Sequence, residues 1–210
     1  MTRSLPLAGL ALALLLASLP LQAQTSQELF HMIDIDRPSA VRTALLRGAK
    51  PDAVDARGDP ALLVAARGGQ QEIVEILVAA GARLDQRNRW GDTALMVAAL
   101  GGHLDTVRYL REKGAAINNS GWTALHYAAS SGSAPLVRYL LDQGADPLAA
   151  GANGVTPLMM AARGNRTAAV QVLLEYGADP AQKNERGETA YDWAVRENFQ
   201  SIIDMLKKAR

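Results

Sequence analysis

The chain has 210 residues, no cysteine, and 22 lysines and arginines against 21 aspartates and glutamates. This near-neutral charge gives no electrostatic reason to expect nucleic-acid binding, and the lack of cysteine excludes disulfides, thiolate metal sites and cysteine nucleophiles. Alanine and leucine are abundant while only 5% of the residues are aromatic, a composition that favours closely packed short helices over sheets.

Residues 1–23 have the pattern of a secretory signal peptide. Arg3 supplies the positive start, the apolar run at 7–19 has the length of a signal-peptide core, and Ala23 is a small residue at the cleavage position. The alternative, an uncleaved membrane anchor, is disfavoured because the run is shorter than the roughly 20 residues that a membrane span needs. We expect the mature chain to begin at Gln24 and to be exported, without membrane attachment, to the periplasm of a Gram-negative bacterium.

From about residue 26 onward, two sequence markers recur with a period close to 33 residues. One is a Gly-Ala pair, at intervals of 33, 33, 30 and 33 residues, and the other is a triplet such as Thr-Ala-Leu, at intervals of 33, 30, 33 and 33. Both series contain the same single deletion of three residues, which chance does not produce. The pairs start at Gly48, Gly81, Gly114, Gly144 and Gly177, and the triplets start at Pro60, Thr93, Thr123, Thr156 and Thr189.

Each period predicts two short helices. The threonine of the triplet stands where a helix N-cap belongs, and Pro157 suits a first helical position because no N–H is needed there. The first helix contains a pair of alanines, which lets neighbouring helices approach closely, and the second helix ends at the Gly-Ala pair. The first helices are expected to end at residues that tolerate a left-handed backbone, namely Gly69, Gly102, Gly132, Asn165 and Asn198.

The stretch GWTALHYAA at 121–129, Gly102-His103 and GADP at 177–180 resemble the motifs of ankyrin repeats. The resemblance implies an all-α fold, an ankyrin-repeat solenoid of stacked helix-turn-helix units with connecting β-turn loops. It also implies that His126 braces its turn by hydrogen bonding. Within residues 24–210 the predicted units are an N-terminal cap at 26–54, repeats at 55–87, 88–117, 118–150 and 151–183, and a C-terminal cap at 184–210.

Candidate chemistry is sparse. The three histidines lie in different units, so no two have metal-ligand spacing, and His31 with Asp34 and Asp36 is a faint metal-like pattern of a kind that is common by chance. A hydrolase would need Ser130 or Ser131 activated by His126, but no orienting carboxylate lies nearby in sequence and no Gly-x-Ser-x-Gly motif exists. We therefore expect no catalytic residue, no metal and no cofactor.

The resemblance implies binding of another protein through the concave face made by turn tips and first helices. Residues just before the helix-ending Gly or Asn face this groove in ankyrins, and three of them here are arginines. They predict a locally basic groove and an acidic partner surface, and an ordinary solvated face is the alternative. The expected protein-binding residues are Arg67, Arg87, Arg89, Trp90, Leu100, Tyr127, Ser130, Arg163 and Arg196.

The tryptophans differ in their expected roles. Trp122 precedes a capping threonine and should pack over the turn, while Trp193 should cover the end of the core. Trp90 lies at a turn tip, where an exposed tryptophan favours contact with a partner, and lying flat on its own repeat is the alternative.

The deletion of three residues shortens the turn at 118–120. Loops tolerate such changes, so the stack should continue through it. The neighbouring longer turn carries Arg87, Arg89 and Trp90, so the row of tips should have a notch with Trp90 as one wall. Neutral drift is the alternative.

Three classes of function remain. The favoured one is a monomeric, non-catalytic interaction module in the periplasm, acting as a scaffold, an inhibitor or an immunity factor. The second is a secreted effector that binds host proteins, which requires export beyond the periplasm. The third is an enzyme or metal protein built on repeats.

Overall fold

The computed structural model describes residues 21–209, with side chains from Thr25 onward. Residues 1–20, most of the predicted signal peptide, lie outside the described residues, and its last three residues belong to the first described helix. The helices are α2 (Leu21–Asp34), α3 (Pro38–Leu46), α4 (Ala61–Arg67), α5 (Gln71–Ala79), α6 (Ala94–Leu100), α7 (Leu104–Glu112), α8 (Ala124–Ser131), α9 (Ala134–Asp142), the 3-10 turn η1 (Ala152–Gly154), α10 (Pro157–Arg163), α11 (Thr167–Glu175), α12 (Ala190–Arg196) and α13 (Gln200–Lys208).

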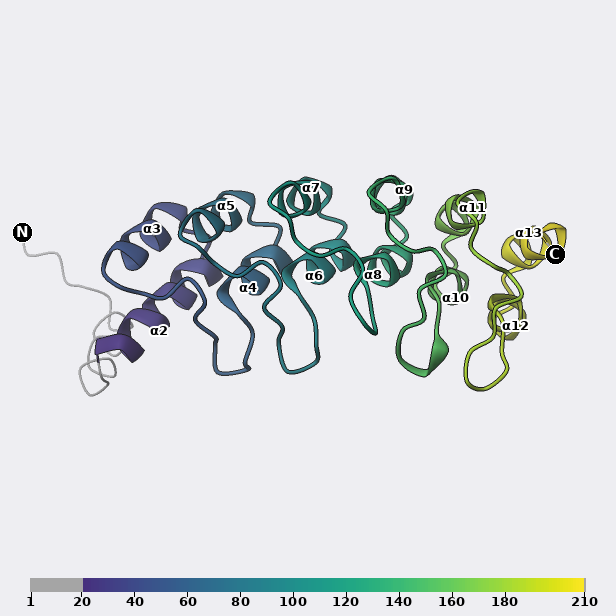
Figure 1. Cartoon of the computed structure of the whole chain (residues 1–210), viewed down its shortest axis with the longest axis horizontal. Coiled ribbons are helices and arrows are strands. Elements are labelled where there is room, and N and C mark those ends of the chain that lie inside the picture. The colour runs from purple at the N-terminus through teal and green to yellow at the C-terminus, as the bar shows by residue number, and fades with distance from the viewer. Residues whose placement is uncertain (1–20, 210) are drawn as a thin grey trace, which may run out of the picture.

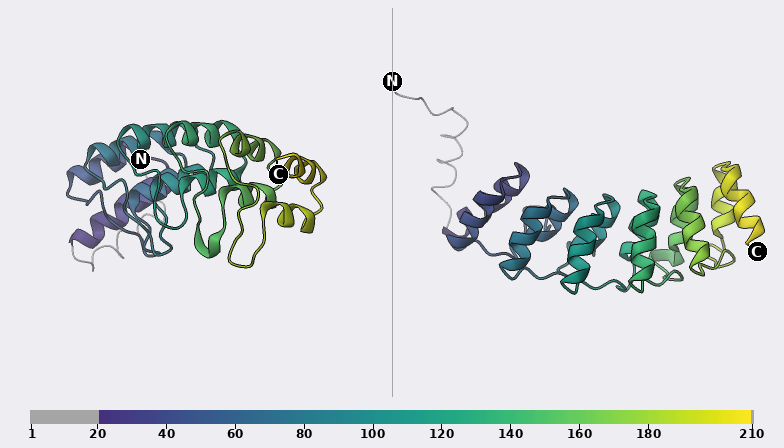
Figure 2. Two further views of the ribbon diagram at one scale, coloured as in Figure 1. Left: turned by 45° about the vertical axis from the view of Figure 1, so that its right-hand side comes forward. Right: turned by 90° about the horizontal axis from the view of Figure 1, so that it is seen from above.

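The helices form two rows, with the loops projecting beyond one of them (Figure 1). The inner row, next to the loops, consists of α2, α4, α6, α8, α10 and α12, and the outer row of α3, α5, α7, α9, α11 and α13. Each inner helix packs on the outer helix of its own unit and on the inner helices of its neighbours. Seen from above, the stack follows a gentle arc (Figure 2). The expected all-α solenoid is confirmed, and an isolated bridge between Val54 and Pro60 is the one strand-like pairing among the described residues.

The capping residues begin the inner helices. The hydroxyls of Thr93, Thr156 and Thr189 accept hydrogen bonds from the backbone N–H three residues on, at 3.4, 3.2 and 3.3 Å. Pro60 has no hydroxyl to offer at the start of α4. There the N–H of Ala61 donates to the carbonyl oxygen of Ala53 at 3.0 Å, so backbone atoms close the turn instead.

The inner helices pack closely because their paired alanines are buried. The pairs at 65–66, 98–99, 128–129 and 161–162 are all 0% exposed. Each of these helices, and α12 as well, is followed by a residue with a left-handed backbone. The residue is Asn165 after α10 and Asn198 after α12, with φ of 55° and 58°, where earlier units have glycine. This short stop turns the chain back into the outer helix.

A ladder of side chains joins successive units at the base of the loops. The backbone N–H of Arg83 donates to Asp52 at 2.7 Å, and that of Ala116 donates to Asp85 at 2.9 Å. In the next unit the N–H of Asp146 donates to the amide oxygen of Asn118 at 3.0 Å. The equivalent residue one unit later is Leu148, which has no acceptor to offer and is 46% exposed.

Candidate functional site

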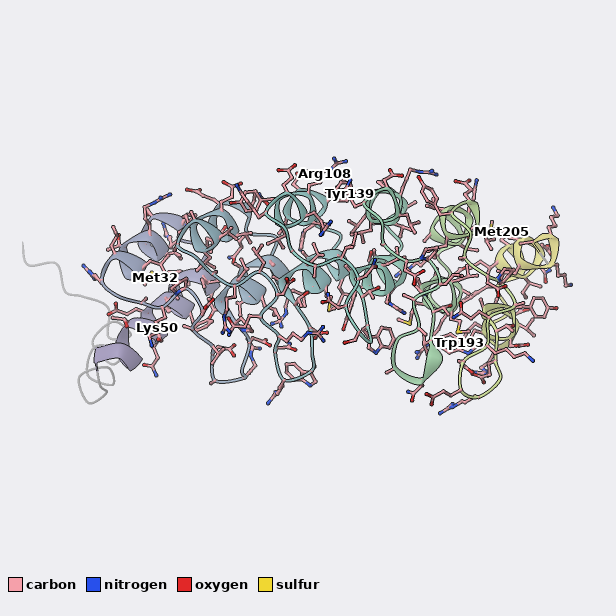
Figure 3. The ribbon with its side chains drawn as sticks, viewed as in Figure 1. Met32, Lys50, Arg108, Tyr139, Trp193 and Met205 are labelled. Atoms are coloured by element: carbon pink, nitrogen blue, oxygen red, sulfur yellow. The ribbon has the colours of Figure 1, made fainter. Side chains whose placement is uncertain are left out.

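Side-chain contacts join three successive helices of the outer row. The Arg108 guanidinium lies 4.6 Å from the ring centre of Tyr139 in the next unit (Figure 3). Arg138 lies 5.6 Å from the ring centre of Tyr176 and donates to Glu175 at 2.9 Å. This ion pair raises the pKa of Arg138 and lowers that of Glu175. These contacts fasten α7 to α9 and α9 to α11.

Side-chain hydrogen bonds fix the loop tips. The amide oxygen of Asn88 accepts the backbone N–H of Trp90 at 3.0 Å and that of Asp92 at 2.9 Å, and Asn184 makes the same pair of bonds in the last loop. Trp90 is 60% exposed at the tip of this closed turn. The Arg89 guanidinium lies 4.1 Å from its ring centre. Trp90 is therefore exposed at the tip of the turn, with the Arg89 side chain of the same turn near its ring.

Two of the three arginines predicted to make the groove basic are paired within the chain. Arg67 donates to Asp59 at 2.7 Å, and this carboxylate is 1% exposed. Arg196 donates to Glu188, whose pKa is lowered to about 2 by hydrogen bonds from Asn184, Trp193 and Arg196. Two of the three charges on which the predicted basic groove depends are therefore neutralised within the chain, because each of these two arginines has a carboxylate eight residues earlier.

Arg163 differs from both. Its position eight residues earlier holds Val155, and no ion pair involving Arg163 is found among the described residues. Its guanidinium lies 5.8 Å from the ring centre of Trp193. Arg163 is therefore the inner-row arginine that forms no ion pair within the described residues.

The remaining predicted contact residues fall into two groups. Leu100 is 47% exposed at the end of α6, beside the loops. Tyr127 and Ser130 are only partly exposed, and both bind neighbouring units. The Tyr127 hydroxyl donates to Asp92, and burial followed by this carboxylate raises its pKa. The carbonyl oxygen of Ser130 accepts from Arg166 at 3.0 Å. These two residues join units, whereas Leu100 offers free apolar surface.

The shortened turn between α7 and α8 projects less than the loops before α6 and α10 (Figure 1). Its Asn118 side chain binds Gly144 and Asp146 across the unit boundary. Arg87, from the preceding loop, donates to Asn119 at 3.3 Å. The predicted step in the row of tips is present, and Arg87 spans part of it.

A cavity that the sequence analysis missed lies beside the shortened turn. It has a volume of about 420 Å³ and is lined by residues of the loops before α8, α10 and α12, by α10 and by the end of α12. Its apolar lining includes Trp122, Val155, Met160 and Trp193, with Arg163 among its polar groups. Figure 3 labels Trp193 near α12, on the side of the molecule that carries the loops.

One position of the repeat, compared between units, could have predicted this cavity. The residue just before the capping position is acidic at Asp59, Asp92 and Glu188, but it is Trp122 and Val155 in two adjacent units. Reading this position across units would have shown where an internal carboxylate is missing.

His126 has a structural role. Its Nδ1 atom accepts the backbone N–H of Thr123 at 3.1 Å, and its Nε2 atom donates to the carbonyl oxygen of Val155 at 3.0 Å. The ring is 0% exposed, and this burial lowers its pKa. Both nitrogens are engaged, so His126 is not placed to activate Ser130, as a hydrolase would need.

Within residues 21–209, no cluster of three or more histidines and carboxylates suited to a metal ion is found. His31, Asp34 and Asp36, the faint metal-like pattern in the sequence, therefore do not form such a cluster. No helix in the same residues is long and apolar enough to cross a membrane.

Comparison with known families supports the repeat assignment. A family model described as ankyrin repeats in three copies matches residues 29–119 and 78–150. A model described as ankyrin repeats in many copies matches residues 142–194. A comparison with curated protein sequences found no match. The family matches together extend over most of the chain.

Proposed function

Because the chain belongs to the ankyrin-repeat family, whose repeats are protein–protein interaction modules, we propose that it is a non-catalytic protein that binds another protein in the periplasm. The family is generally non-catalytic. The pattern of residues 1–23 supports export. A scaffold, an inhibitor and an immunity factor are the roles that fit such a module.

The observation that carries the proposal is the exposed aromatic and apolar surface on the loop side of the stack. On the outer row, arginines and tyrosines of successive units bind each other. On the loop side, Trp90 and Leu100 are exposed, and a cavity opens between Trp122 and Trp193. Exposed aromatic groups on a rigid frame are typical anchors of protein interfaces.

Capture from the periplasmic fraction tests this function. The mature chain, carrying a C-terminal tag, is cross-linked in intact cells and purified with its bound protein, and the affinity of the purified pair is measured by calorimetry. We expect Trp90→Ala combined with Leu100→Ala to weaken binding by at least about tenfold, since buried aromatic anchors dominate interfaces.

Arg108→Ala is the matched control because it alters the outer row, and it should bind as tightly as the unmodified chain. A partner whose affinity falls with Arg108→Ala and not with the double variant would contradict the proposed face. Recovery of the chain in the medium, bound to host proteins and not to a periplasmic one, would favour the secreted-effector alternative.

A further inference from the structure

The inner helices α4 and α12 each have an arginine near the end that pairs with a carboxylate just before the start of the helix. Asp59 precedes the start of α4 and accepts from Arg67 at its end, and Glu188 precedes α12 and accepts from Arg196. In both cases the two residues are eight positions apart. The carboxylate lies between the loop and the end of the helix and neutralises the arginine there.

In α10 the arginine is present and the carboxylate is missing. Arg163 occupies the position of Arg67 and Arg196, while Val155 replaces the acidic residue and is itself buried. The Arg163 guanidinium lies 5.8 Å from the ring centre of Trp193 and forms no ion pair among the described residues, so its fork of N–H donors can bind a carboxylate. The cavity of about 420 Å³ is found at this place.

The charge of the cavity matches a single anionic group. Its lining holds three arginines and two glutamates, so it is positive by one charge. One arginine and one glutamate of that set, Arg196 and Glu188, are already paired with each other. Trp122, Val155 and Met160 provide an apolar wall beside the charge.

We propose that this cavity binds an aspartate or glutamate side chain of the partner protein, paired with Arg163, with an adjacent apolar side chain against Trp122, Val155 and Met160. The partner's carboxylate takes the place that Asp59 and Glu188 occupy in the other units. The inference rests on the proposed function and narrows the acidic partner surface to one acidic residue next to an apolar one.

The probe is an N-acetylated, C-amidated pentapeptide with one glutamate between two leucines, titrated into the mature chain and followed by two-dimensional NMR. We expect saturable shifts of the Arg163 Nε–H signal and of the indole N–H signals of Trp122 and Trp193. A matched peptide with glutamine for glutamate should bind at least about tenfold more weakly, because a charge-assisted hydrogen bond is lost.

Two arginine variants distinguish binding in the cavity from a nonspecific effect of removing a positive charge. Arg163→Ala should abolish the preference for the glutamate peptide, while Arg67→Ala, which changes an equivalent helix position far from the cavity, should keep it. Val155→Glu supplies an internal carboxylate as Glu188 does, so it should block the peptide without lowering the melting temperature. The absence of saturable shifts, or equal binding of both peptides, overturns the proposal.

The outcome with the captured partner distinguishes this inference from the broader function. A partner that binds Arg163→Ala as tightly as the unmodified chain overturns the carboxylate site and leaves the interaction module standing. Peptide binding that depends on Arg163, in a chain that captures no partner, supports the site and contradicts the broader proposal.

Discussion

At the scale of single residues, the buried imidazole of His126 links stability to pH. The fold lowers its pKa through burial, so the neutral ring is favoured in the folded state and the unfolded chain binds a proton first on acidification. This contribution to stability is fully present above the ordinary pKa of 6.5 and is lost as the pH falls below it. Protonation of Nδ1 also removes the acceptor for the Thr123 N–H.

We therefore expect the urea concentration at the midpoint of unfolding to decrease as the pH is lowered from 7.5 to 5.5. His126→Gln should be less stable at pH 7.5 and should show a flatter dependence over this range, since the two other histidines are common to both proteins. Equal slopes for the two proteins would show that His126 is not the titrating group.

Arg67 and Arg163 occupy the same helix position but should respond differently to truncation. Arg67→Ala leaves the buried Asp59 carboxylate with the Asn88 amide as its remaining side-chain partner. The free energy of unfolding should therefore fall by about 1 kcal/mol. This is at the low end for an unsatisfied buried acceptor, because water can reach the carboxylate from the side where the exposed arginine lay. Arg163→Ala removes no ion pair and should change the free energy of unfolding by less than about 0.5 kcal/mol. Denaturant unfolding of both variants measures the difference, and similar losses would contradict the assignment of their partners.

At the scale of elements, the hydrogen-bond ladder between units stops at Leu148. The periodic equivalent of the N–H donors of Arg83, Ala116 and Asp146 is the backbone N–H of Asp179. Leu148→Asn should supply the missing acceptor and stabilise the chain by about 0.5–1.5 kcal/mol. Leu148→Ala is the control, because it removes the exposed side chain without adding an acceptor. A gain of the same size in both variants would assign the effect to the loss of leucine.

The shortened turn between α7 and α8 allows a second test at this scale. Three residues inserted after Asn119 restore the period, and the free energy of unfolding should change by less than about 0.5 kcal/mol because loop closure depends weakly on length. If the step beside Trp90 admits a partner, the insertion should weaken binding, while the same insertion after Arg57 in the first loop should not. Unchanged affinity in both variants would identify the short turn as neutral drift.

At the scale of the whole molecule, the proposed export depends on cleavage of residues 1–23 from the helical stack. We expect N-terminal sequencing of periplasmic protein to begin at Gln24, as the residue pattern of 1–23 predicts. Ala23→Lys should block cleavage, because a signal peptidase requires a small residue there. An intact Met1 in the membrane fraction of cells that express the unmodified chain would contradict export as a cleaved protein.

The sequence by itself determined the period, the helix starts and the all-α stack. These features depend on local chemistry. The hydroxyl of Thr156 caps the helix that begins at the next residue, and Asn198 takes the left-handed backbone that ends another. Interactions between residues three or four positions apart can be predicted from a single sequence. The repetition of the same pattern along the chain showed that the pattern was not due to chance.

Only the tertiary structure decided which of the predicted contact residues are free. Tyr127 and Asp92 are 35 residues apart and meet because neighbouring inner helices pack side by side, so Tyr127 is tied into the stack. Arg67 and Arg163 look alike in sequence, yet the loop folds a carboxylate onto the first and leaves a cavity beside the second. Side chains from three units enclose that cavity, and its existence depends on their packing in space.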